Sequence, residues 1–208
     1  MNTSSQIYRL RTPISEEEIR RLRIGDIVYL DGILVGARDA AHKKALSLLE
    51  RGEKLPIELE GLALYHVGPV VKKKDTGEWE VIAAGPTTSA RMESVEADFI
   101  EKTRVRMVVG KGGMGPRTAE ACRKYGAVYA VFTGGAAVLA ASAIKRVVDV
   151  YWLEELGMAE ALWVFEVENF GPLTVVIDSS GRNYYSEVLA KARETMESIL
   201  SKEPWRED

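Results

Sequence analysis

Residues 105–132, VRMVVGKGGMGPRTAEACRKYGAVYAVF, decide the fold class, because they alternate between strand and helix patterns. The apolar run Val105–Val109 predicts a buried strand that leads through a glycine loop into a helix at Arg117–Lys124. Gly126 ends this helix, and a second apolar run, Val128–Phe132, predicts another buried strand. Strands that alternate with helices are typical of layered α/β proteins.

Segments on the N-terminal side of this stretch predict two hairpins. Ile27–Leu30 and Ile33–Ala37 are strand-like runs on either side of Asp31-Gly32, the strongest short hairpin signal of the chain. Leu62–Val70 and Glu78–Ala84 predict a second pair of strands, joined by a polar turn. Hairpins followed by strand–helix alternation indicate a layered β/β/α domain with a mixed sheet and flanking helices.

The remaining segments predict an N-terminal arm, further helices and a C-terminal group of strands. We expect residues 1–24 to form an extended arm with a short helix, whose capping box pairs Ser15 with Glu18. Residues 25–208 are expected to form a single domain, in which Asp39 caps the first helix. The other helices are expected at Thr88–Lys102, Ala136–Lys145 and, with an apolar stripe, Ser186–Ser201; the other strands are expected at Val147–Trp152, Ala161–Val167 and Leu173–Asp178.

The composition excludes several classes of protein. A net charge of −3 over 208 residues provides no general attraction to nucleic acid or to an anionic membrane. The N-terminus lacks the apolar core of a signal peptide, and the uncharged run Val131–Ile144 is too short and too weakly apolar to span a bilayer. We therefore expect a cytoplasmic protein without a membrane or nucleic-acid partner. The scarcity of Asn and Gln is typical of thermophile proteins.

One cysteine and two histidines limit what the chain can bind on its own. A single thiol, Cys122, excludes an internal disulfide and cannot hold an iron–sulfur cluster, which needs three or four thiolates. Too few ligands are present for a closed zinc site. We expect Cys122 to be a small buried residue and His42 to be structural, whereas structural and site-lining roles suit His66 equally well.

Two polar glycine loops, Gly85–Arg91 (GPTTSAR) and Gly110–Arg117 (GKGGMGPR), form the main candidate site. Each follows a predicted strand and precedes a predicted helix, where free backbone N–H groups and the helix dipole attract an anion. Arg91 and Lys111 add one fixed positive charge to each loop. Arg38 also follows a predicted strand, and an arginine binds a carboxylate through two parallel hydrogen bonds. The loops therefore predict a site for a small dianion such as a dicarboxylate.

Each cation also has a structural interpretation. Lys111 lies in a G-x-G-x-x-G pattern that matches the dinucleotide fingerprint formally, but the acid after the next strand is missing, and a turn with a solvated lysine explains it too. Arg91 follows residues that commonly cap helices, so a plain N-cap would leave its side chain in solvent. Arg38 suits an ordinary ion pair with Asp39.

Four motifs occur in an order and spacing that resemble one enzyme family: GARDAAHK (36–43), GPTTSARM (85–92), GKG (110–112) and GGAA (134–137). Together they make the chain similar, over roughly residues 25–185, to the beta subunit, or C-terminal domain, of the iron–sulfur-dependent class I fumarases and L-tartrate dehydratases. The resemblance implies a swivelling β/β/α domain. It also implies a [4Fe–4S] cluster that three cysteines of a partner alpha subunit hold, in a hetero-oligomer expected to be α2β2.

The resemblance further implies an activity and roles for four residues. The reaction would add water reversibly to fumarate to give L-malate, with Arg38, Arg91 and Lys111 binding the substrate carboxylates. Thr87 would lie at the reacting carbon, either as a proton-transfer group that Lys111 or another neighbour activates or as a group that only orients the substrate. L-tartrate or methylfumarate (mesaconate) is an alternative substrate. A non-catalytic module that binds a nucleotide or phosphate is an alternative of a different class.

Overall fold

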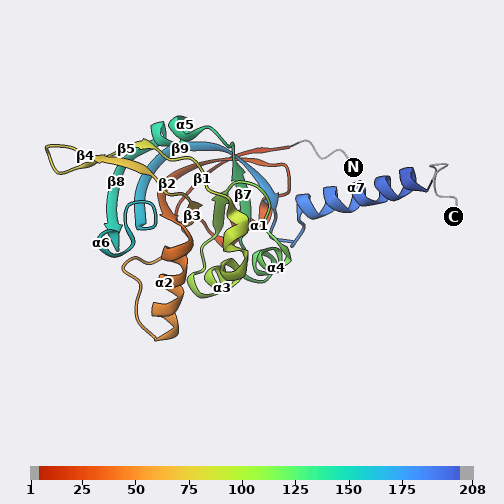
Figure 1. Ribbon diagram of the computed structural model, residues 1–208, viewed down its shortest axis with the longest axis horizontal. Helices are drawn as coiled ribbons and strands as arrows, with labels where there is room; N and C mark the ends of the chain where they lie inside the picture. Colours follow the sequence, from red (N-terminus) through yellow and green to blue (C-terminus); the bar gives the residue numbers. More distant parts are fainter. Residues whose placement is uncertain (1–4, 202–208) are drawn as a thin grey trace.

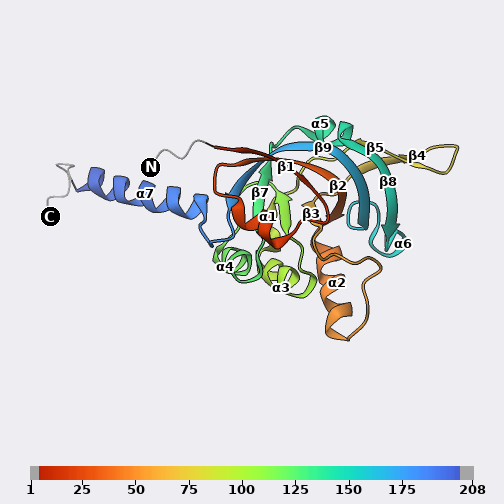
Figure 2. The ribbon, with the colours of Figure 1, turned by 180° about the vertical axis from the view of Figure 1, so that it is seen from behind.

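Seven strands form one curved, mixed sheet in the computed structural model, which describes residues 5–201 (Figures 1 and 2). Their order across the sheet is β1-β2-β3-β6-β7-β9-β8. These strands are β1 (Ile7–Arg11), β2 (Ile27–Ala37), β3 (Ala63–His66), β6 (Met107–Gly110), β7 (Val128–Phe132), β8 (Ile144–Tyr151) and β9 (Leu162–Ile177). A smaller sheet pairs β4 (Val70–Lys73) with β5 (Trp79–Ala83). With the helices described below, this arrangement confirms the predicted α/β class.

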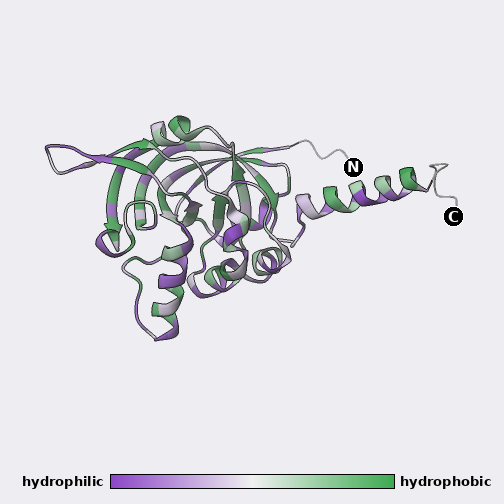
Figure 3. Ribbon diagram, viewed as in Figure 1, coloured by the Kyte–Doolittle hydropathy of each residue, from purple (hydrophilic) through white to green (hydrophobic). Residues whose placement is uncertain are grey.

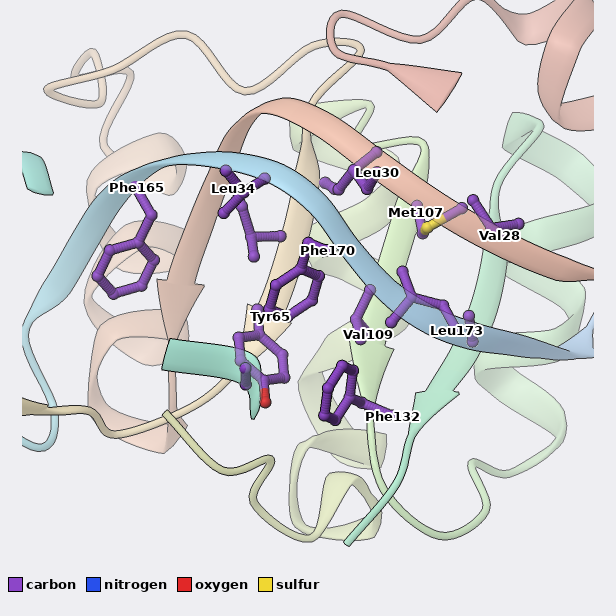
Figure 4. Close-up of a cluster of buried hydrophobic side chains, with 14 of the residues drawn as sticks. Val28, Leu30, Leu34, Tyr65, Met107, Val109, Phe132, Phe165, Phe170 and Leu173 are labelled. Carbon is purple, nitrogen blue, oxygen red and sulfur yellow. The ribbon is translucent and has the colours of Figure 1, made fainter. Parts of the chain in front are cut away.

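The long strand β9 closes the large sheet on itself. It pairs antiparallel with β7 and β8 along one edge and with β2 along the other. β2, β3, β6 and β7 pair with one another in parallel, so the pairings form a ring. The ring encloses a core of large apolar side chains (Figure 4), which includes Val28, Leu34, Tyr65, Val109, Phe132, Phe165, Phe170 and Leu173. Two walls of sheet with a core between them make the β/β part of the predicted layering.

Three helices form the third layer on the other face of the sheet: α2 (Asp39–Glu50), α3 (Glu93–Thr103) and α4 (Pro116–Tyr125). Leu64 and Val108 of the sheet share a buried cluster with Phe99 of α3 and Cys122 of α4. Cys122 is fully buried, and burial raises the pKa of its thiol, as expected for a small packing residue. The shorter elements are α1 (Glu16–Arg21), the 3-10 helix η1 (Ser89–Met92), α5 (Ala137–Ser142) and α6 (Leu153–Leu156).

The hairpin predicted around Asp31-Gly32 is wrong, because β2 continues without a break from Ile27 to Ala37. Gly32 has a φ of +96° and lies at a register shift against β9, so it forms a bulge instead of a turn. The first half of β2 pairs in parallel with β1 and the second half with β3. A reversal of the chain at Asp31 would remove the second set of backbone hydrogen bonds, which the closed sheet requires.

Two further strand predictions need correction. The strands predicted at Ala161–Val167 and Leu173–Asp178 are parts of the single strand β9. The strand predicted at Leu62–Val70 divides around Gly68-Pro69 into β3 of the large sheet and β4 of the small one. A proline cannot donate a ladder hydrogen bond, which is consistent with a break at this point.

Predictions for the ends of helices are partly confirmed. The Ser15 hydroxyl accepts from the N–H of Glu18 at 3.2 Å, and the Glu18 carboxylate accepts from the N–H of Ser15 at 2.9 Å, which confirms the capping box. The capping role expected of Asp39 is wrong: Arg38 is the N-cap of α2, and Asp39 is the first helical residue. Part of the expected arm forms β1, whereas residues 1–4 and 202–208 lie outside the described residues.

The last helix, α7 (Tyr184–Leu200), carries the expected apolar stripe, but this stripe does not pack on the sheet (Figure 3). Val188, Leu189 and Met196 are each about half exposed, at 47%, 52% and 53%. The helix projects away from the body of the molecule in both views (Figures 1 and 2). Among the helices of residues 5–201, none is long and apolar enough to cross a membrane.

Candidate anion-binding site

Three parallel strands end at one edge of the sheet and bring the predicted cations there. β2, β3 and β6 are neighbours, so their carboxyl ends meet. Arg38 directly follows β2, and Lys111 directly follows β6. Thr87 is attached to the end of β3 because its N–H donates to the carbonyl of His66 at 2.7 Å. Segments far apart in the sequence thus meet at one place.

Backbone contacts join the two glycine loops into one unit. Thr88 and Lys111 form an isolated parallel bridge. The N–H of Ser89 donates to the carbonyl of Lys111 at 3.2 Å. The start of η1, which carries Arg91, is therefore held directly against the residue that carries the second cation.

Arg91 connects the first loop with helix α2. Its Nη2 lies 3.1 Å from Oδ2 of Asp39 and donates to the Thr87 hydroxyl at 2.9 Å. Partial burial opposes ionisation of Asp39, but the hydrogen bonds from Arg91, a backbone hydrogen bond and the charges of Arg91 and Arg38 together outweigh it and lower the pKa of this carboxyl. Because the Thr87 oxygen accepts from a guanidinium, the hydroxyl hydrogen is available for another acceptor. The Arg91 side chain is 44% exposed, yet these contacts hold its guanidinium beside Thr87 and the start of α2.

Arg38 forms an ion pair with Glu160, instead of the pair with Asp39 that its structural interpretation predicts. Its Nε lies 3.2 Å from Oε1 of Glu160, and both side chains are 25% exposed. The other oxygen of Glu160 accepts from the N–H of Ala40 at 2.9 Å, so this carboxylate also binds the start of α2. A Cβ on Gly68 would lie 2.7 Å from the backbone oxygen of Ala159 and 2.8 Å from Nη1 of Arg38, so a larger residue there would crowd this guanidinium.

Lys111 differs from the two arginines in its surroundings. It is exposed, and no carboxylate within residues 5–201 forms an ion pair with its ammonium group. The next residue, Gly112, has a φ of +73°, and its carbonyl accepts from the Tyr129 hydroxyl at 2.9 Å. The loop is therefore fixed through its backbone, while the charge of Lys111 is left unbalanced.

The helix that follows the second loop does not offer free N–H groups, and this part of the prediction is wrong. The carboxylate of Glu93 accepts from the N–H of Gly115 at 2.7 Å and of Arg117 at 3.1 Å. The same carboxylate accepts from the Thr118 hydroxyl at 2.7 Å. A side chain of α3 thus occupies the positive end of α4, and an external anion must be bound chiefly by the cationic side chains.

Beneath the loops, His42, His66 and Glu96 form a fully buried cluster. Oε2 of Glu96 lies 2.9 Å from Nε2 of His66 and 3.4 Å from Nε2 of His42. Burial favours the neutral acid, but the two imidazoles outweigh it and lower the pKa of Glu96 to about 2. Burial also opposes an imidazolium, yet Glu96 raises the pKa of His42, whereas burial lowers that of His66. These opposite directions favour a positive charge on His42 over one on His66.

The same three side chains are also the one group in residues 5–201 whose nitrogen and oxygen ligand atoms, all within 4.8 Å of one another, suit a metal ion. Sequence patterns singled out both histidines and the loop that contains Ser89, but not Glu96. Glu96 carries a signal, since it lies three and four residues before the buried Phe99 and Ile100 on one face of α3. An acid on an apolar helix face requires a buried partner. The hydroxyl of Ser89, expected to face an anion, instead contacts Nδ1 of His66.

Comparison with known proteins relates the chain to one family. Residues 2–188 match the family model described as Fumarase C-terminus. The chain is 48% identical to L(+)-tartrate dehydratase subunit beta of Escherichia coli (strain K12) over 178 residues, which are 86% of each protein. A putative L(+)-tartrate dehydratase subunit beta of Methanocaldococcus jannaschii is 45% identical over 187 residues, 90% of this chain and 95% of that protein. A putative fumarate hydratase class I of Geobacillus stearothermophilus is 39% identical over 203 residues, 98% of this chain but 38% of that protein.

Proposed function

This chain belongs to the fumarase C-terminus family of hydro-lyases, and from that premise we propose that it is the beta subunit of a two-subunit enzyme that adds water reversibly to fumarate. The family predicted from the four motifs is thereby confirmed. The product would be L-malate. The subunit would supply the groups that bind the substrate carboxylates.

One observation supports this proposal above all: Arg38, Arg91 and Lys111 come from three loops and lie at one edge of the sheet near Thr87. Addition of water to an α,β-unsaturated acid builds negative charge on one carboxylate, and fixed cations stabilise that charge. Asp39 and Glu160 already balance the two arginines. The unbalanced charge of Lys111 therefore adds the most to attraction of a dianion.

Thr87 is proposed as the proton-transfer group. A threonine hydroxyl is a weak acid and base at neutral pH, so it needs an activating neighbour. Arg91 donates to its oxygen at 2.9 Å, and a hydrogen bond from a guanidinium stabilises negative charge on that oxygen. This hydrogen bond supports Arg91 as an activating neighbour of Thr87, beside Lys111.

The [4Fe–4S] cluster that the resemblance implies does not fit this chain. Cys122 is its one cysteine and is fully buried between the sheet and α4. We therefore propose that a cysteine-containing alpha subunit holds the cluster, in a hetero-oligomer such as α2β2. The printed names of two relatives, subunit beta, support the existence of a partner subunit. Residues of this chain would bind and orient the substrate and move a proton at Thr87.

L-tartrate is the second candidate substrate. It is favoured by the names of the two relatives that match along most of both chains. Like fumarate, it is a four-carbon dicarboxylate, so the three cations would bind its carboxylates in the same way. The local geometry of this subunit does not separate the two substrates, and the assay below includes both.

The test is expression of the chain with its alpha subunit under anaerobic conditions, followed by hydro-lyase assays on fumarate, L-tartrate and mesaconate. We expect activity on a dicarboxylate from the complex and none from the chain alone. Arg38→Ala, Arg91→Ala and Lys111→Ala should each lower kcat/KM by about 10²–10³-fold, the loss typical of one oxyanion donor. Arg123→Ala is the matched control, because Arg123 is exposed on α4, where it pairs with Glu120.

Two results would refute the proposal. A complex with a full cluster that converts none of the three dicarboxylates would exclude the activity. Tight binding of a nucleotide by the chain alone, measured by calorimetry with ATP and NAD, would instead favour the non-catalytic binding module.

A further inference from the structure

Resting on the proposed function, we propose that one buried polar cluster, which runs from His42 through Glu96 and His66 to Ser89, positions all three loops of the site. Glu96 is the positioning residue at its centre. All four side chains are fully buried, so none of them touches substrate. They act through the loops that they hold.

The first part of the cluster fixes Arg38. Nδ1 of His42 donates to the carbonyl oxygen of Arg38, 2.8 Å away. Nε2 of the same ring faces Oε2 of Glu96 at 3.4 Å. This second contact is an electrostatic approach without a hydrogen bond, and the charge of Glu96 raises the pKa of His42 against the effect of burial. The turn from β2 into α2 is thus tied to the carboxylate of α3.

The second part fixes the loop that carries Thr87 and Arg91. Nε2 of His66 donates to Oε2 of Glu96 at 2.9 Å, which leaves Nδ1 to accept from the Ser89 hydroxyl at 2.9 Å. The carbonyl of His66 accepts the N–H of Thr87 at 2.7 Å. Both ends of this histidine therefore hold the same loop, one through the backbone and one through the side chain.

The third part reaches the loop of Lys111. The N–H of Ser89 donates to the carbonyl of Lys111 at 3.2 Å, so the residue that His66 holds is joined directly to this loop. The Tyr129 hydroxyl donates to the carbonyl of Gly112 at 2.9 Å and fixes the next residue of the loop. Gly110 leaves room for the contact between Ser89 and His66, because a Cβ there would overlap the Ser89 hydroxyl oxygen and lie 3.1 Å from Nδ1 of His66. The buried cluster is thus connected to the loop of Lys111.

A buried ionic cluster suits a positioning role better than a purely stabilising one. Replacing buried ion pairs with apolar residues is often neutral or stabilising, so their presence requires another reason. Each hydrogen bond here has one acceptor and a defined direction, which sets the loops at fixed distances from one another. Site geometry must be held to about 0.5 Å for full effect, and such precision comes from packed hydrogen-bonded support.

A metal ion is the competing occupant of the cluster. Both Nε2 atoms and the carboxylate face one another, and both Nε2 of His42 and Oε1 of Glu96 are buried without a hydrogen-bond partner. The 2.9 Å contact between His66 and Glu96, however, is the length of a direct charge-assisted hydrogen bond. Both Nδ1 atoms already bind groups outside the cluster. The geometry therefore favours protons, and the test includes metal analysis.

The experiment compares Glu96→Gln, Glu96→Asp and the control Glu101→Gln in the complex with the alpha subunit. Glu101 lies on the same helix and is exposed. Succinate, a non-reacting dicarboxylate, serves as the binding probe in calorimetry. We expect Glu96→Gln to raise the succinate Kd and the substrate KM by about tenfold or more, with partial recovery in Glu96→Asp and no change in the control.

Amide hydrogen exchange of residues 85–91 provides a readout that does not depend on the reaction. It should be at least about tenfold faster in Glu96→Gln, whereas a merely stabilising residue would leave exchange through local opening of this loop unchanged. Ser89→Ala, which retains both buried charges, tests the same link if Glu96→Gln fails to fold. Unchanged exchange and unchanged Kd in the folded variants would overturn the proposal.

Two other outcomes are distinguishable from these. One equivalent of tightly bound zinc per beta chain would overturn the hydrogen-bond assignment in favour of a metal centre. If the wild-type complex binds no succinate and hydrates no dicarboxylate, the proposed function fails. Faster exchange in Glu96→Gln would then still support the positioning of the loops, and normal exchange would refute it.

Discussion

Gly110 provides the sharpest prediction for the packing beneath the site. In Gly110→Ala, the new methyl group would overlap the Ser89 hydroxyl oxygen and lie 3.1 Å from Nδ1 of His66 and 3.2 Å from Cβ of Ser89. Ser89 and His66 are both 0% exposed, so neither side chain has space to retreat. Something in the buried cluster must therefore move.

The expected cost follows from two effects. Overpacking of a buried site by one methyl group costs about 1–3 kcal/mol. The hydrogen bond between Ser89 and His66, 2.9 Å long, would be broken or bent, which removes about 1 kcal/mol more. We therefore expect Gly110→Ala to lower the free energy of unfolding by about 2–4 kcal/mol.

The assay is urea unfolding of the chain, followed by circular dichroism. With an m-value of about 2 kcal/mol/M, the midpoint should fall by about 1–2 M at constant slope. Gly134→Ala is the matched control, since a Cβ at Gly134 meets nothing within 4 Å and its φ is not positive. Reduced entropy of the unfolded chain should make that variant neutral or about 0.4–1 kcal/mol more stable.

A double variant tests the cause. Ser89→Ala removes the oxygen that the new methyl group meets first, so it should recover part of the stability lost in Gly110→Ala. The reasoning is refuted if Gly110→Ala and Gly134→Ala have the same midpoint. It is also refuted if the two changes at Gly110 and Ser89 are simply additive.

Three further predictions concern the charges around the site. Glu93→Ala should lower the free energy of unfolding by about 1–2 kcal/mol, as for a lost helix cap, because three donors at the start of α4 lose their acceptor. Glu93→Gln keeps one acceptor oxygen, so it should lose less stability in the same urea assay. The pKa of Glu96 is lowered from 4.5 to about 2, so the contribution of its charge to folding stability is present above pH 4.5 and is lost as the pH falls toward 2. The pKa of His42 is raised above 6.5, so the contribution of its charge to folding stability is lost as the pH rises beyond that value. Urea midpoints should thus be highest between these limits, and an acid limb equally steep in Glu96→Gln would contradict this. Arg91→Lys keeps the charge but not the planar set of donors to Asp39 and Thr87, so KM for the dicarboxylate should rise by about tenfold, against a larger loss in Arg91→Ala; equal kinetics of Arg91→Lys and wild type would exclude the geometric role.

Local sequence patterns predicted some elements correctly. Val128–Phe132 is a strand with the predicted bounds, and the capping box of Ser15 and Glu18 is present, because each depends on residues close in the sequence. The Asp31-Gly32 pair gave a wrong hairpin prediction because the same residues suit both a turn and a bulge. The choice between them depends on β1, β3 and β9, which pair with β2 from distant parts of the chain.

For the candidate site, the sequence alone determined the residue types. Arg38 and Lys111 follow directly on the end of a strand, a position that exposes a charge at the edge of a sheet, and Arg91 lies in the short helix that ends the first glycine loop. Only the tertiary structure decided which acids balance them, since Glu160 contacts Arg38 although the two are distant in the sequence. It also decided that the start of α4 is occupied and that a buried glutamate lies between two histidines. Hydrogen bonds act over about 3 Å of space, and sequence order says little about which distant groups come that close.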